Sequence, residues 1–220
     1  MIDALLISLQ LSTITTLILL LLALPLAYVL AFRSFAGRTA LEVVVALPLV
    51  LPPTVLGYYV LLLIAPDSFV GRLWQTVFDS SLAFSFSGMV LASVLYSLPF
   101  AVQPLQQAFR AIPKHWLELG KIQAMTRWQV LRQIVLPASK GGMLVAIALS
   151  FAHTMGEFGV VLMVGGSIPS ETKVASIALF EMVEIQQQSE ASMLALILMV
   201  VAFALLSLVY SINRKTGLMT

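Results

Sequence analysis

Residues Ala4–Phe32 read ALLISLQLSTITTLILLLLALPLAYVLAF, a run without Asp, Glu, Lys or Arg. An α-helix rises about 1.5 Å per residue, so about 20 residues cross the roughly 30 Å hydrocarbon layer of a bilayer. The run is therefore long enough to span a membrane. Asp3 is the only charge before it, and the apolar run is longer than that of a secretory signal peptide. We therefore expect a retained first span.

Four further stretches have the length and composition of membrane spans. Three of more than 20 residues lack charged side chains: Val43–Pro66, Ser80–Phe109 and Ala191–Asn213. Another, from Gly141 to about Val164, is interrupted only by His153 and Glu157. The whole chain is 60% hydrophobic and 10% charged, whereas soluble domains carry about 25% charged residues. We predict an all-α protein with five transmembrane helices in a single domain over residues 1–220.

Basic residues gather on one side of this arrangement. Alternate loops place ten of them on one face: Arg33, Arg38, Arg110, Lys114, Lys121, Arg127, Arg132, Lys140, Arg214 and Lys215. The other face carries Arg72, Lys173 and most of the acidic residues. The positive-inside rule then predicts an outside N-terminus and a cytoplasmic C-terminus, and it explains the net charge of +2 without nucleic-acid binding. Whether outer segments 67–79 and 166–190 re-enter the membrane is left open.

Prolines interrupt the second span at Leu51-Pro52-Pro53-Thr54. Each proline removes a backbone donor and frees a carbonyl that lipid cannot satisfy. The cluster predicts a broken helix that exposes the Thr54 hydroxyl at membrane depth. The alternative is that these prolines only kink a packed helix.

The longest predicted inner loop, residues 110–140, mixes basic and apolar side chains between Pro113 and Pro137. Its composition alone suits an amphipathic helix pair on anionic headgroups. The order of its residues, ELGKIQAMTRWQVLRQIVLP from Glu118, resembles the cytoplasmic EAA loop of ABC importer permeases. The stretch departs from that pattern where Leu119 and Gly120 replace two small residues and where Ala124 stands in place of the usual Gly. The resemblance implies coupling helices that dock on an ATP-hydrolysing subunit. The implied coupling residues are Trp116, Glu118, Leu119, Gly120, Ala124, Trp128, Ile134, Leu136 and Pro137.

Three further motifs indicate which group of ABC importer permeases the chain resembles. LPLVLPPTVLGY, residues 47–58, is similar to the second-span signature of molybdate permeases. MGEFG (155–159) and SIPSET (167–172) are similar to elements shared by molybdate, tungstate and sulfate permeases. The resemblance, over roughly residues 5–212, implies an inner-membrane permease domain that imports an oxyanion by alternating access, molybdate first, with tungstate or sulfate/thiosulfate as alternatives. It also implies a homodimer, two ABC ATPase subunits and an extracytoplasmic oxyanion-binding protein.

The sequence contains no motif for ATP hydrolysis or for metal binding that could drive transport. It contains no G-x-x-x-x-G-K-[ST] phosphate loop, so we expect ATP and Mg²⁺ to bind the partner subunit. With no cysteine and two histidines far apart, we expect no metal site, no cofactor and no enzymatic activity in this chain. An ion-coupled secondary transporter is the alternative from another class. Such transporters often show repeated halves and paired intramembrane charges, and neither is found here.

The spans contain no Lys or Arg, so we predict a weak pathway lined by hydroxyl and amide groups. Ser93 and Gln103 are considered for it, and the candidate pathway residues are Pro52, Pro53, Thr54, Gly57, Ser97 and Thr154. The alternative for each is ordinary interhelical hydrogen bonding. Glu157, with Gly156 and Gly159, is interpreted as a structural polar site whose carboxylate accepts hydrogen bonds from freed backbone. The alternative is a direct transport role, and His153 is interpreted as a packed polar partner.

Overall fold

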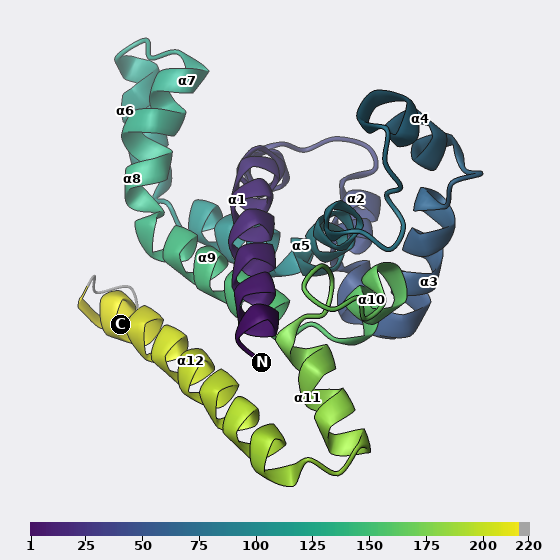
Figure 1. Ribbon diagram of the computed structural model, residues 1–220. Coiled ribbons are helices and arrows are strands. Elements are labelled where there is room, and N and C mark those ends of the chain that lie inside the picture. The colour runs from purple at the N-terminus through teal and green to yellow at the C-terminus, as the bar shows by residue number, and fades with distance from the viewer. Residues whose placement is uncertain (216–220) are drawn as a thin grey trace.

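The computed structural model describes residues 1–215, in which the regular elements are all helical (Figure 1). The helices in chain order are α1 (Ile2–Phe32), α2 (Arg38–Ala46), the 3-10 helix η1 (Leu47–Leu49), α3 (Pro53–Ile64), α4 (Phe69–Phe78), α5 (Phe86–Arg110), α6 (Lys114–Ile122), α7 (Arg127–Val130), the π-helix η2 (Leu131–Val135), α8 (Leu136–Ala138), α9 (Lys140–Met155), α10 (Gly159–Gly165), α11 (Ala175–Glu184) and α12 (Gln188–Lys215). The predicted all-α class is confirmed.

Helices α1 and α5 form the centre of the bundle and run in the same direction. Near their starts, Leu11 packs in one buried cluster with Met89. Near their ends, Leu30 and Phe109 share a second buried cluster. The bundle therefore has two ends, one where α1 and α5 begin and one where both finish.

Within residues 1–215, three helices are long and apolar enough to cross a membrane: α1, α5 and the segment Gln188–Ser207 of α12. Two bent pairs pass the same test, Arg38–Leu49 with Pro53–Ile64 and Arg127–Ala138 with Lys140–Met155. The described residues thus offer three to five candidate spans, and the count of five remains a prediction. Large apolar side chains such as Met199 and Phe203 are exposed along α12, as expected for a lipid-facing helix.

The second predicted span is broken where the prolines stand. The axes of the two halves, Arg38–Leu49 and Pro53–Ile64, differ by 111°. Pro53 is the first residue of α3, a position where the missing N–H costs nothing because it has no helical partner. The predicted break is confirmed, and Thr54 in the first turn of α3 is exposed.

The fourth predicted span is also divided, which the sequence interpretation did not anticipate. Helix α9 ends at Met155 and α10 begins at Gly159. The expectation of one continuous span from Gly141 to about Val164 is therefore wrong. Helix α10 packs closely on α3 and α5: a Cβ on Gly57 would lie 2.8 Å from Met163 Cβ, and one on Gly165 would lie 2.4 Å from Met89 Sδ.

Candidate functional site

Helices α6, α7 and α8 with η2 form a hairpin that stands away from the other helices (Figure 1). This segment, residues 114–138, is referred to as the arm. It follows directly from the end of α5 and so belongs to the end of the bundle where α1 and α5 finish. Arg38 and Arg110 lie at the same end, where both contact Glu42, the Arg110 Nη2 at 2.7 Å. Glu42 thus neutralises part of the basic charge of that end.

The two halves of the arm pack closely at Gly120. A Cβ there would lie 3.1 Å from Val130 Cγ2 and 3.2 Å from Ile134 Cδ1. The second half begins with a capping box in which Thr126 and Gln129 exchange side-chain to backbone hydrogen bonds. Local sequence therefore fixes both the approach of the two halves and the start of the second.

Ala124 forms the turn between the two halves. Its φ is +49°, in the left-handed region, which glycine adopts most readily. The Met125 amide donates to the Gly120 carbonyl at 2.9 Å across it, the closing hydrogen bond of a Schellman helix end. Ala124, which stands where the EAA pattern usually has glycine, thus has a backbone conformation that glycine adopts most readily.

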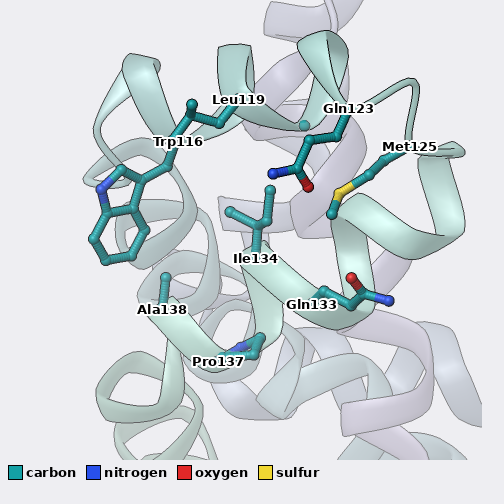
Figure 2. A pocket seen from close by; sticks show the side chains of 9 residues that line it. Trp116, Leu119, Gln123, Met125, Gln133, Ile134, Pro137 and Ala138 are labelled. Carbon is teal, nitrogen blue, oxygen red and sulfur yellow. The ribbon is translucent and has the colours of Figure 1, made fainter.

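The arm carries a pocket of about 520 Å³ (Figure 2). Its lining residues are Trp116, Leu119, Gly120, Gln123, Met125, Gln133, Ile134, Pro137 and Ala138. Five predicted coupling residues are among them. Of the others, Glu118 and Trp128 are exposed and Leu136 is half-buried, and Ala124 forms the turn. Ile122, which the sequence interpretation did not single out, is 79% exposed near the tip.

A second cavity, of about 570 Å³, lies where α3, α5 and the α9–α10 junction meet. Its lining residues are Pro53, Thr54, Tyr96, Ala152, His153, Gly156, Glu157, Phe158 and Gly159. The broken helix and the Glu157 site, predicted separately, therefore share one cavity. Gly159 allows this approach, because a Cβ there would lie 3.0 Å from Pro53 Cβ.

Glu157 is anchored by hydroxyl groups of α5. Its side chain is 1% exposed, and its carboxylate accepts hydrogen bonds from Ser93 Oγ at 2.5 Å and Ser97 Oγ at 2.6 Å. The expectation that backbone groups near Gly156 and Gly159 supply these donors is wrong. The carboxylate reaches across to α5 because Ser93 and Ser97, one helical turn apart, present two hydroxyls on one face.

The cluster lies well inside the bundle. Ser93 and Ser97 lie roughly 10–16 Å along the 25-residue helix α5 from its first residue. The Glu157 carbonyl also accepts a hydrogen bond from the Ser176 hydroxyl of α11. Glu157 therefore joins three elements at the break between α9 and α10.

Some of the candidate pathway residues line the cavity, and the others pack between helices. Pro53 and Thr54 line the cavity, and Pro52 is exposed beside them. Ser97 and Thr154 are buried with their hydroxyl oxygens 3.0 Å apart, in the interhelical role given as the alternative. Gly57 is buried against Met163.

Sequence reasoning missed Tyr96 as a lining residue. The signal was present in its spacing, because Ser93, Tyr96, Ser97 and Phe100 follow the i, i+3, i+4, i+7 pattern of one helix face. Tyr96 and Phe100 both pack on the His153 ring, with centroids 4.8 Å and 4.0 Å from it. The interpretation of His153 as a packed polar residue thus describes its surroundings, although it also lines the cavity.

A separate polar cluster lies in the segment that carries SIPSET. Lys173 Nζ is 2.6 Å from the Glu181 carboxylate of α11, which also accepts a hydrogen bond from Ser167. The hydrogen bond from Lys173, with a smaller contribution from Ser167, lowers the pKa of the Glu181 carboxyl below its ordinary value. These contacts tie the 167–173 loop to α11.

Comparison with known proteins identifies the family to which the chain is similar. Its residues 23–215 match the family described as binding-protein-dependent transport system inner membrane component. The molybdenum transport system permease protein ModB of Azotobacter vinelandii is 43% identical over 212 residues, covering 96% of this chain and 94% of the relative. The sulfate transport system permease protein CysT of Escherichia coli K12 is 29% identical, covering 87% and 69%.

The fold also has a close structural counterpart. A bacterial ABC transporter involved in the import of the acidic polysaccharide alginate superposes with a TM-score of 0.77 at 18% identity, covering 97% of this chain and 79% of the other. At this identity the likeness concerns the fold alone. The arrangement of helices described above is therefore one that an ABC importer also uses.

Proposed function

This chain belongs to the family of binding-protein-dependent transport system inner membrane components, and from that premise we propose that it is the membrane-spanning permease subunit of an ATP-driven molybdate importer. It is a multi-pass membrane protein of the permease class and not a catalytic subunit. The observation that carries the choice of molybdate is the 43% identity to a molybdenum permease across 96% of the chain. A sulfate substrate has weaker support, because the sulfate permease is less similar and is covered over only 69% of its length.

In the proposed arrangement five spans cross the inner membrane, with the N-terminus outside. The parallel packing of α1 and α5 supports it, because the arm and the Arg38–Arg110 cluster then lie together at the cytoplasmic end. The second and fourth crossings are the broken ones. The predicted outer segments contain α4 and α11.

The energy for import comes from partner subunits in this proposal. Moving a dianion inward against about 100 mV costs roughly 4.6 kcal/mol. The arm presents Trp116, Leu119 and Ile122 as exposed apolar groups, which suit docking of a helix pair in a groove of an ATPase. Two copies of the chain, each carrying one arm, then engage two ATPases around a single pathway, and an extracytoplasmic binding protein delivers the oxyanion.

Reconstitution with the cognate ATPase and binding protein tests the proposal. ATP hydrolysis in proteoliposomes is measured with molybdate, tungstate and sulfate, each loaded on the binding protein. We expect stimulation by molybdate well above that by sulfate. Stimulation by sulfate alone would assign the chain to the sulfate branch, and a chain that transports without any ATPase subunit would contradict the whole proposal.

A further inference from the structure

The His153 imidazole is held in a fixed orientation. Its ring stacks on Phe100 with an interplanar angle of 25°, and Tyr96 packs against it. Its Nδ1 lies 2.8 Å from Ser97 Oγ and 3.4 Å from Glu157 Oε1. These contacts leave the ring little freedom to rotate, so each of its nitrogen atoms faces a defined environment.

The hydrogen atoms of the cluster determine what each nitrogen carries. A serine hydroxyl has one proton, and Ser97 donates it to the Glu157 carboxylate at 2.6 Å. The Ser97 oxygen is then an acceptor towards His153, so Nδ1 carries a hydrogen atom. In neutral imidazole the other nitrogen, Nε2, is then an acceptor, and only a second proton converts it into a donor.

Nε2 is the nitrogen available to the cavity. It lies on the opposite side of the ring from Nδ1. Within residues 1–215 no protein group forms a hydrogen bond with Nε2, and Nε2 is not one of the buried polar atoms that lack a partner. His153 lines the 570 Å³ cavity, and its side chain is 20% exposed. An Nε2–H group would therefore be presented to whatever occupies that space.

Among the described residues that line the cavity, His153 alone can become a cation. The other titratable groups that line it are Tyr96 of α5 and Glu157 of the α9–α10 junction, while α3 contributes Pro53 and Thr54, which carry none. With neutral His153 the lining has the negative charge of Glu157. A second proton on His153 makes the imidazolium–carboxylate pair neutral overall and removes the net charge that would repel a dianion.

We propose that protonated His153 donates a hydrogen bond from Nε2 to the oxyanion as it passes through this cavity, while Ser97 and Glu157 hold Nδ1–H. This inference rests on the proposed function and names the contact through which the substrate is handled. The Thr54 side chain lines the same cavity from α3 and offers a second donor. Transport then requires a proton on His153, and the import rate rises as the pH is lowered.

Uptake of radiolabelled molybdate by the reconstituted complex tests this, with saturating loaded binding protein and the rate normalised to ATP hydrolysed, from about pH 8 to about pH 6. His153→Phe keeps the aromatic packing and removes both N–H groups, whereas His153→Gln keeps a neutral donor. We expect the wild-type rate to increase towards pH 6. His153→Phe should be about tenfold slower or more at that pH, as for a lost hydrogen bond to a charged group, and without pH dependence. The uptake rate of His153→Gln should lie between those of wild type and His153→Phe, and it should also be independent of pH.

The chain's other histidine supplies the control. His115 is exposed on the arm, so His115→Gln should keep the wild-type slope with pH. A wild-type rate that does not change with pH, or a His153→Gln variant that keeps the wild-type rate and slope, would overturn the inference while leaving a molybdate importer intact. A wild-type complex that moves no molybdate would instead overturn the proposed function, and this inference with it. If His153→Phe does not assemble, a flat wild-type profile still overturns the inference, and the comparison of wild type with His153→Gln still tests whether the slope depends on His153.

Discussion

The backbone N–H of Met125 donates to the carbonyl of Gly120 across a left-handed Ala124. A residue with a Cβ in this conformation costs roughly 1–2 kcal/mol, and the arm bears that cost at its turn. The hydrogen bond and the Thr126 capping box on the following residues offset it. The turn is therefore strained but closed.

Ala124→Gly should stabilise the arm by about 1 kcal/mol, because glycine adopts the left-handed conformation without the steric cost. Hydrogen exchange of the arm amides in detergent measures this as slower exchange. Ala111→Gly is the matched control, because Ala111 at the end of α5 is right-handed and gains nothing from glycine. Faster exchange in Ala124→Gly would show that the turn does not limit the stability of the arm.

Sequence reasoning succeeded where the signal is local. Charge-free runs predicted the apolar helices, and the prolines predicted the break before α3. The EAA resemblance implied coupling helices, and the structure has a helix pair there whose turn is at Ala124. It failed at the α9–α10 junction, because one acidic residue, Glu157, between apolar stretches did not mark the end of a helix. The donors to Glu157 were also missed, since Ser93 lies 64 residues away along the chain and only tertiary packing brings them together.

Gly57→Ala should destabilise the contact between α3 and α10 by about 1–3 kcal/mol, because the added methyl group overlaps Met163 Cβ and is close to the Val160 backbone. Gly156→Ala is the matched control: its Cβ would lie 3.7 Å from the nearest atom, an ordinary contact. Thermal unfolding in detergent compares the two. Equal midpoints would mean that the α3–α10 contact can relax around a methyl group.

Ser93→Ala should cost about 1–3 kcal/mol, because it leaves one oxygen of the buried Glu157 carboxylate without its donor. Ser87→Ala, at an exposed position of the same helix, should change stability little. Thermal unfolding of the two variants separates loss of this hydrogen bond from loss of a serine on α5. If both behave as wild type, the Ser93–Glu157 contact does not hold the junction.

The Lys173–Glu181 contact should make the 167–173 loop sensitive to acid. Because the pKa of the Glu181 carboxyl is lowered from 4.5, the contact contributes stability that is fully present above about pH 4.5 and is lost as the pH falls through the lowered value. The pair is partly exposed, so we expect less than about 1 kcal/mol. Hydrogen exchange of the loop, corrected for intrinsic rates, should quicken in acid for wild type and for Glu184→Gln, an exposed neighbour. Glu181→Gln should exchange faster already at neutral pH and respond less to acid.

In the proposed arrangement, Ile122→Ser should weaken the association with the partner ATPase without destabilising the chain. The side chain is 79% exposed at the end of α6, so its replacement disturbs no internal packing. Removing it from a groove on a partner, however, forfeits roughly 1.5–3 kcal/mol of apolar burial.

Phe69→Ser is the control, because it removes an equally exposed apolar group, 77% accessible, at the opposite end of the bundle on α4. Co-purification of each variant with the tagged ATPase measures the difference, and unfolding midpoints confirm that both chains are intact. The arm follows directly from the end of α5, at the basic end of the bundle. A loss of ATPase binding in Ile122→Ser but not in Phe69→Ser would therefore place the ATPase at that end. An equal loss in Phe69→Ser would leave the arm without a specific partner and favour its alternative role as an amphipathic pair on the membrane surface.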